Sequence, residues 1–235
     1  MDKSMTQAWQ ESVDFWNQVY ELPEGGEEEE TEGAEADWKA LAPSEKQLLA
    51  ITELTECRQL LDYGCGQGWG SVIAACAGCP SVTAVDVAEN GARCAALYAG
   101  QYGVADRVRS MRIQENWLES VEPGSYDGFF CSNVLDVVPT EVAESILAGA
   151  ARVLRPGSKL VISLNYYMEP KADPARKISV RDSCIFIDGV LRLNSLTDGE
   201  WRRMLEKYFR VDSLTYYAWP GEQAERRRLF RLTRL

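Results

Sequence analysis

An apolar run that ends in an acid and three alternating glycines constrains the fold of this chain more than any other segment. The run occupies residues 60–70, LLDYGCGQGWG, and the small apolar segment 71–77 follows it. This order predicts a strand, a tight glycine loop and a helix. Because glycine has no Cβ, Gly64, Gly66 and Gly68 let the backbone adopt unusual φ and let a ligand approach it closely. The segment therefore predicts a ligand site at the end of a strand.

The glycine spacing and the charge beside it indicate the kind of ligand. A dinucleotide-binding loop has the spacing G-x-G-x-x-G/A, with a pyrophosphate over the helix N-terminus. Counted from Gly64 or from Gly66, the last position falls on Trp69 or on Ser71, so neither register fits. Asp62 would repel a pyrophosphate and suits a ligand that is positively charged near the loop. S-adenosylmethionine carries both an ammonium and a sulfonium.

The same residues resemble motif I of the class I S-adenosylmethionine-dependent methyltransferases, hydrophobic-hydrophobic-D/E-x-G-x-G-x-G. The motif is matched in full by Leu60, Leu61, Asp62, Gly64, Gly66 and Gly68. The resemblance implies an α/β fold in which a seven-stranded, mostly parallel sheet has helices on both faces and its last strand antiparallel. It covers residues 58–235, about three quarters of the chain. The alternative is a glycine-rich turn without a ligand.

Length and charge limit the other classes of function. The chain has 235 residues, enough for one α/β domain with added segments. Its net charge is −11 and its sequence pI is about 4.7, which argues against nucleic acid or an anionic membrane as a partner. The basic cluster 226–228 is interpreted as solvated strand ends on an acidic protein. The oligomeric state is not predicted.

The seven cysteines predict no metal centre. Cys76 and Cys79 have C-x-x-C spacing, which is compatible with redox or zinc chemistry and also with an ordinary helix end. With no second C-x-x-C and no histidine in the chain, the helix end is favoured. No apolar run reaches the length of a membrane span, about eighteen residues, and no secretory leader is recognisable. We therefore expect a soluble, cytoplasmic protein.

Residues 1–57 are expected to form a helical cap on the domain. Trp9, Val13, Trp16 and Tyr20 recur with helical spacing and so share one helix face. The acidic segment 24–36 has no periodicity, and we interpret it as a flexible linker, with binding to a partner as the alternative.

From residue 58 the chain alternates strands and helices, which predicts a parallel sheet covered on both faces. Helices are expected at 93–102, 140–154 and 197–208. Strands are expected at 59–65, 81–87, 108–113, 126–134, 159–167, 209–219 and 225–235.

Candidate cofactor residues follow the ends of the first four strands. Asp86 lies about twenty residues past the glycine loop, where an acid can accept both ribose hydroxyls, and Val87 follows it. The family resemblance places adenine beside Glu115 and Asn116. The remaining candidates are Trp117, against the adenine face or the sheet edge, and Asn133, near the sulfonium.

The acceptor end of the site is less defined. Asn133 is followed by Val and Leu, so the N/D-P-P-Y/F element of methyltransferases that act on amino groups of bases or glutamine is absent. Residues 168–196 form an insertion with a type I′ hairpin signal at Asp188 and Gly189, either a substrate lid or an edge hairpin. Asp136 is the candidate general base. The candidate acceptor contacts are Tyr20, Tyr166, Tyr167 and Phe186.

These observations favour methyl transfer from S-adenosylmethionine to a small molecule. Two alternatives stay open, namely a protein methyltransferase and a non-catalytic module that binds S-adenosylmethionine and recruits a protein.

Overall fold

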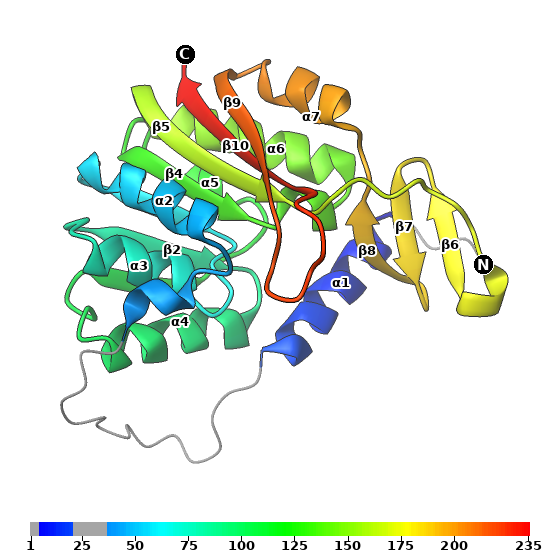
Figure 1. Ribbon diagram of the computed structural model, residues 1–235, viewed down its shortest axis with the longest axis horizontal. Helices are drawn as coiled ribbons and strands as arrows, with labels where there is room; N and C mark the ends of the chain where they lie inside the picture. Colours follow the sequence, from blue (N-terminus) through cyan, green and yellow to red (C-terminus); the bar gives the residue numbers. More distant parts are fainter. Residues whose placement is uncertain (1–4, 21–36) are drawn as a thin grey trace.

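A computed structural model describes residues 5–20 and 37–235 of the chain (Figure 1). Its central feature is a seven-stranded sheet of order β3-β2-β1-β4-β5-β10-β9. The strands are β1 (Leu60–Tyr63), β2 (Val82–Asp86), β3 (Val108–Arg112), β4 (Tyr126–Ser132), β5 (Leu154–Leu164), β9 (Phe209–Tyr217) and β10 (Arg227–Arg234). The first five run parallel to one another, and β10 lies antiparallel between β5 and β9. The predicted α/β sheet with an antiparallel last strand is confirmed.

Helices cover both faces of this sheet, as predicted. On one face α2 (Glu45–Glu53), α3 (Trp69–Cys76) and α4 (Glu89–Gln101) share a core with β1 and β2. On the other face lie α5 (Trp117–Ser120), α6 (Thr140–Val153) and α7 (Asp198–Leu205), which contribute to a second core. Short 3₁₀ turns complete the description: η1 (Trp38–Leu41), η2 (Leu54–Glu56), η3 (Leu135–Val137) and η4 (Pro174–Arg176).

Local signals in the sequence explain where several helices begin. Gly68 is the N-cap of α3 at φ 81°, a left-handed conformation that favours glycine. Thr197 and Glu200 form a reciprocal capping box at the start of α7. Ser44 accepts a hydrogen bond from the Gln47 N–H at the start of α2. The strand β1 is buried at all four positions, as expected of a central parallel strand.

The insertion forms a separate three-stranded antiparallel sheet of β6 (Ile178–Arg181), β7 (Cys184–Ile187) and β8 (Val190–Asn194). The turn between β7 and β8 has Asp188 at φ 53° and Gly189 at φ 81°, so the type I′ hairpin prediction is confirmed. Strand β6 was not predicted. Phe186 packs with Cys184 and Leu191 in a small core of this sheet.

The N-terminal helix α1 (Met5–Val19) lies between the insertion and the main domain (Figure 1). Ser12 Oγ donates to the Leu191 carbonyl of β8 at 3.3 Å. At the other end of α1, Asn17 Oδ1 accepts the backbone N–H of Asn90, at the start of α4. The helix is therefore attached to two elements far apart in sequence. The expected acidic linker, 24–36, lies outside the described residues.

The basic cluster is not a set of solvated strand ends, so that expectation was wrong for two of its three residues. Arg227 and Arg228 are 7% and 2% exposed. Arg227 pairs with Glu222, and Arg228 pairs with Asp198 at 2.6 Å. The physical reason is that β10 is an interior strand, whose ends are covered by its neighbours.

Two further expectations concern cysteines and membranes. Cys79 Sγ lies 3.8 Å from Cys57 Sγ, whereas its C-x-x-C neighbour Cys76 ends α3. Among the described residues, no group of three or more potential ligands could hold a metal ion. Within 5–20 and 37–235, no helix has the length and apolarity needed to cross a membrane.

Candidate active site

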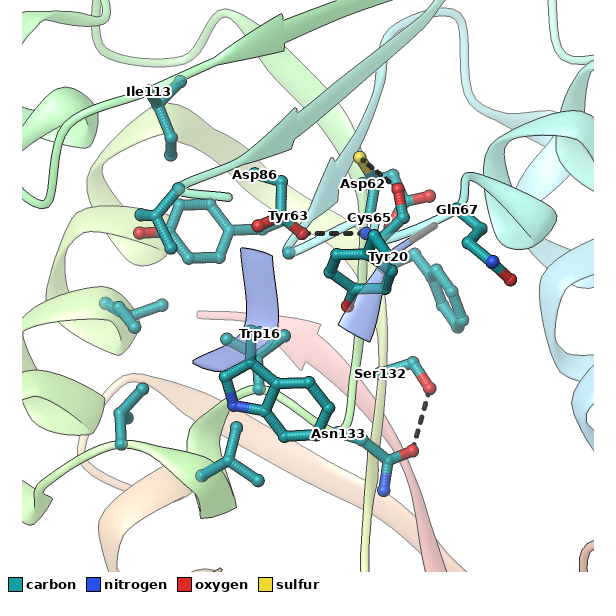
Figure 2. A pocket seen from close by; sticks show the side chains of 18 of the residues that line it. Trp16, Tyr20, Asp62, Tyr63, Cys65, Gln67, Asp86, Ile113, Ser132 and Asn133 are labelled. Atoms are coloured by element: carbon teal, nitrogen blue, oxygen red, sulfur yellow. Dashed lines mark hydrogen bonds between the residues drawn. The ribbon is translucent and has the colours of Figure 1, made fainter. Parts of the chain in front are cut away.

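A cavity of about 290 Å³ opens at the carboxyl ends of β1, β2, β3 and β4. The glycine loop and the acids after β1 and β2 line one part of it. Side chains of α1 and Tyr20, which directly follows it, line another part, with Trp16 and Tyr20 facing the loop (Figure 2). The candidate ligand loop and the aromatic face of the N-terminal helix therefore share one enclosure.

The glycine loop approaches its surroundings more closely than a side chain would allow. Gly64 and Gly66 have φ of 71° and 50°. A Cβ built on Gly64 would lie 2.2 Å from Val134 Cγ2, and one on Gly66 would lie 2.8 Å from the Tyr20 hydroxyl. Both positions therefore require glycine, for conformation and for space. Gly68 lies behind the loop, where it begins α3 and packs on Ala95.

Two buried carboxyl groups lie beneath this loop. Asp62 is 1% exposed, and burial raises its pKa to about 7, although Ser71 Oγ donates to Oδ2 at 2.5 Å. The two Asp86 oxygens accept the backbone N–H groups of Gly66 and Ala88, each at 2.8 Å. Burial raises the Asp86 pKa, and those hydrogen bonds oppose the shift. The loop is thus tied directly to the acid that follows β2.

The charge of the lining is entirely acidic among the described residues. Asp62, Asp86 and Glu115 line the cavity, and no lysine or arginine of the described chain does so. An acidic cavity lining favours a cationic ligand group and disfavours phosphate. The residues present therefore fit an ammonium and a sulfonium, as the sequence predicted.

Two aromatic residues of α1 and Tyr20, which directly follows it, reach the cavity. Trp9 Nε1 donates to the Glu115 carboxylate, so the acid proposed for adenine already has one partner. Trp16 Nε1 is buried without a hydrogen-bond partner. Burial raises the pKa of the Tyr20 phenol, and the Asp86 charge adds to the shift, so this group stays protonated. Tyr20 also packs on Gly91, where an added Cβ would lie 3.2 Å from its ring.

The remaining wall is apolar and comes from the end of β4, η3 and α6. It includes Val134, Val137, Val138, Val142 and Ile146. Asn133, in the left-handed region at φ 56°, is the polar residue at this end. Sequence reasoning missed these valines and also Trp219, which reaches the cavity from the β9–β10 loop. Trp219 precedes a Pro-Gly turn, and that turn was the only sequence signal that a loop would present an aromatic residue here.

Several predicted site residues lie outside the cavity lining. Asn116 and Trp117 line a shallow hollow on the outer side of α5. Tyr166 stacks under Arg226 at 4.5 Å, and Tyr167 is 45% exposed. Phe186 is buried in the insertion sheet, whose contact with the site is made through α1. The structure therefore does not place Tyr166, Tyr167 or Phe186 at the cavity.

Asp136, the predicted general base, is not at the cavity surface either. The residue is fully buried, and its Oδ2 accepts the Asn165 backbone N–H at 2.5 Å. Burial raises its pKa to about 6. The hydrogen bond links η3 to the end of β5, so the geometry assigns Asp136 a positioning role. From the same segment, Val134, Val137 and Val138 line the cavity instead.

Comparison with known proteins agrees with this geometry. Residues 61–162 match the family model described as "Methyltransferase domain". The fold is similar to a geranyl diphosphate C-methyltransferase of Streptomyces coelicolor, with TM-score 0.66 and 13% identity over 97% of this chain and 98% of that one. It is also similar to an S-adenosylmethionine-dependent methyltransferase of Mesorhizobium loti, with TM-score 0.63 and 20% identity over 83% of this chain and 100% of that one.

Curated relatives are similar over part of their length. A ubiquinone biosynthesis O-methyltransferase of Xanthomonas euvesicatoria is 35% identical over 105 residues, 45% of this chain and 42% of the relative. One of Xanthomonas campestris is 30% identical over 134 residues, 57% of this chain and 54% of the relative. The chain thus spans about half the length of the curated relatives it matches.

The sheet order, the acid–glycine loop and the matched domain together define a methyltransferase of the Rossmann-like type. The matched domain, the relatives and the similar structures support a class I S-adenosylmethionine-dependent methyltransferase.

Proposed function

We propose that this protein transfers a methyl group from S-adenosylmethionine to an oxygen of a small, largely apolar molecule. The observation that carries the proposal is that the acid–glycine loop and an aromatic and aliphatic wall line the same cavity. The relatives named as O-methyltransferases support oxygen as the acceptor atom. The net charge of −11 supports an acceptor other than nucleic acid.

The chain's own residues would hold the cofactor as follows. Asp62 and the loop Gly64–Gly68 would bind the methionine end, because a buried acid and close backbone suit an ammonium group. Asp86 would accept the ribose hydroxyls, with Val87 against the ring. Glu115 would take the adenine amino group on the carboxylate oxygen that Trp9 leaves free. Asn116 and Trp117 would contribute only through the backbone or the adjacent surface.

Binding and alignment account for the chemistry that this site offers. Bound S-adenosylmethionine supplies a methyl group on a sulfonium, which is already a good leaving group. The wall of Val137, Val138 and Val142 would align the acceptor and keep water away from the reacting centre. Favourable alignment is worth effective molarities of roughly 10⁵ M or more.

Among the lining residues that the structure describes, none is an evident general base for the acceptor. The chain has no histidine, and the raised pKa of Tyr20 makes its phenolate scarce at neutral pH. Asp62, Asp86 and Glu115 have their proposed roles at the cofactor. An acceptor hydroxyl that ionises readily, such as a phenol, would therefore suit this enclosure better than an alcohol.

Two alternatives differ in a measurable way. A protein acceptor would need an open groove, whereas Trp16 of α1 and Tyr20, which directly follows α1, lie across this cavity. A non-catalytic module would bind S-adenosylmethionine without turnover.

The test is to incubate the protein with S-adenosylmethionine carrying a labelled methyl group and three acceptor fractions. These are total nucleic acid, denatured proteome and a metabolite extract from the source organism. We expect label in the low-mass fraction, and none with Asp86→Ala. Label in polymer would overturn the small-molecule acceptor. Cofactor binding without transfer to any fraction would support the non-catalytic module.

A further inference from the structure

A series of hydrogen bonds runs from α2 through β5 and β4 to a residue that lines the cavity. It starts at Gln47, a fully buried residue of α2 whose Nε2 donates to Ser163 Oγ at 3.3 Å. Ser163 Oγ donates to Ser132 Oγ at 2.7 Å, and Ser132 Oγ donates to Asn133 Oδ1 at 3.1 Å. The series thus joins α2, β5 and β4 to the residue that follows β4.

The direction of these hydrogen bonds matches the way in which the Asn133 amide is turned. Ser44 Oγ donates to Gln47 Oε1 at 3.5 Å, which leaves Gln47 Nε2 to donate onward. Each serine hydroxyl has one hydrogen, so once Ser163 accepts from Gln47 it donates to Ser132, and Ser132 donates in turn. Asn133 Oδ1 is thereby used as an acceptor, and Figure 2 shows Nδ2 turned away from Ser132.

Asn133 Nδ2 has no hydrogen-bond partner although it is buried. Its backbone is also fixed, because its N–H donates to the Ser163 carbonyl at 2.8 Å and its φ is 56°. An unpaired buried amide is costly, since it loses water without a replacement. A ligand in the cavity that Asn133 lines can supply the missing acceptor.

Trp16, which lines the same cavity from α1, carries a second unpaired donor. Trp16 Nε1, on α1, is buried without a partner. Both unpaired groups donate, and neither accepts. The described lining has no lysine or arginine, so a phosphate or diphosphate would be buried there without a countercharge. An acceptor that matches these groups therefore bears oxygen lone pairs and carries no phosphate.

We propose that Asn133 Nδ2 donates a hydrogen bond to a second, neutral oxygen of the acceptor molecule and so selects acceptors with that oxygen over analogues that have carbon in its place. The oxygen is a carbonyl or ether oxygen beside the methylated hydroxyl on an apolar skeleton, and Gln47, Ser163 and Ser132 act as positioning residues. This inference rests on the proposed function, because it assumes that the acceptor occupies this cavity beside the cofactor.

The experiment compares two probes that differ by one oxygen, guaiacol and 2-ethylphenol. Their dissociation constants are measured by ligand-observed NMR with the protein saturated with S-adenosylhomocysteine. We expect the wild type to bind guaiacol about fivefold more tightly, which is the range of one hydrogen bond. Asn133→Asp keeps the shape and the left-handed preference but removes the donor, so the preference should disappear.

Gln47→Met tests the end of the hydrogen-bond series that lies farthest from the cavity. It removes the donor that sets the direction, at a site outside the cavity lining. We expect the guaiacol preference to fall while S-adenosylhomocysteine affinity, measured by calorimetry, is unchanged. Thr52→Ala, on the exposed face of the same helix, is the matched control and should keep the preference. Thermal unfolding identifies any variant that fails to fold. If either Asn133→Asp or Gln47→Met does not fold, the probe preference of the other variant tests the proposal.

The outcomes separate this inference from the proposed function. If the wild type fails to bind S-adenosylhomocysteine, the proposed function is wrong. If it binds, but neither probe binds or both bind equally, the role of Asn133 is wrong. If Asn133→Asp weakens S-adenosylhomocysteine binding and leaves the probe preference intact, the donor serves the cofactor, and the inference is overturned.

Discussion

Gly64 and Val134 are in contact so close that a Cβ on the glycine would lie 2.2 Å from Val134 Cγ2. Gly64 follows β1 and Val134 follows β4, and these strands are neighbours in the sheet. The ends of two adjacent parallel strands therefore meet at the cavity without space between them. The glycine is required as much by the neighbouring strand as by the ligand.

Gly64→Ala should weaken cofactor binding strongly and lower stability. The new methyl group would overlap a side chain, and φ of 71° is unfavourable for alanine. We expect the free energy of unfolding to fall by about 1 to 3 kcal/mol, and S-adenosylhomocysteine affinity to fall more than tenfold. Urea unfolding and calorimetry measure the two effects.

Gly103→Ala is the matched control for that change. Its φ is 66°, but nothing lies within 4 Å of the added Cβ. It should therefore show the cost of backbone strain without loss of affinity. Equal effects from the two variants would mean that contact with Val134 is unimportant.

Asp86→Ala should weaken binding of S-adenosylmethionine by at least tenfold. Removing the carboxylate would leave ribose hydroxyls unpaired, and hydrogen bonds to charged groups are worth roughly 1.5 to 3 kcal/mol. It would also release the Gly66 N–H, which Asp86 holds at 2.8 Å. Calorimetry that finds unchanged affinity in the folded variant would remove the ribose assignment, and tight NADH binding by the wild type would overturn the motif interpretation.

Binding of S-adenosylhomocysteine should depend on pH through Asp62. Burial raises the pKa of this carboxyl from 3.8 to about 7, so below that pH it is mostly protonated. The ligand's ammonium favours the ionised form, so binding releases a proton and affinity rises with pH. We expect about a fivefold gain between pH 6 and pH 7.5. Calorimetry in two buffers of different ionisation enthalpy measures the released proton.

The ligand-free protein should show the opposite trend in stability. The unfolded carboxyl ionises near pH 4 and the folded one near 7, so the folded state binds more protons between them. The free energy of unfolding contributed by Asp62 therefore falls as pH rises through this window. Asp62→Asn should remove both the proton release and this slope; persistence of the proton release would assign it to another group.

Asp136→Asn should leave the pH profile of methyl transfer unchanged. The side chain is fully buried and bonded to the Asn165 N–H, away from the cavity lining. Its raised pKa, about 6, makes wild-type stability fall as pH rises from about 4 to 6, and the variant should lack that contribution. Urea unfolding at pH 5 and pH 7.5 tests this. A loss of 10²-fold or more in the transfer rate would restore Asp136 as the base.

The fold could be predicted because its signals are local. The run at β1, the glycines and the Asp188–Gly189 turn each specify a backbone conformation from neighbouring residues. Strand β6 was missed because Ile178–Arg181 is short, only partly buried and stabilised by pairing with β7. Pairing between segments that are distant in the chain produces little signal in the sequence of either segment.

The cofactor end of the site was predictable for the same reason, and the acceptor end was not. Asp62, Asp86 and the glycines are placed by strand ends whose order the sequence reveals. Trp219 reaches the cavity only because β9 and β10 pair beyond β5, which brings their loop toward α1. Tyr166 was expected there because it follows β5, but Arg226 stacks on it at 4.5 Å. Side-chain direction at a strand end depends on such tertiary partners.

The double attachment of α1 has a consequence for how ligand binding spreads through the molecule. One side of the helix lines the cavity with Trp9 and Trp16, and Tyr20 directly after it does the same, while Ser12 bonds to Leu191 of β8. A ligand that fixes those aromatic side chains also holds the helix against the small sheet. Amide hydrogen exchange in β8 should therefore slow when the cavity is filled, although no residue of that strand lines it. The insertion would then report occupancy of a site it does not touch.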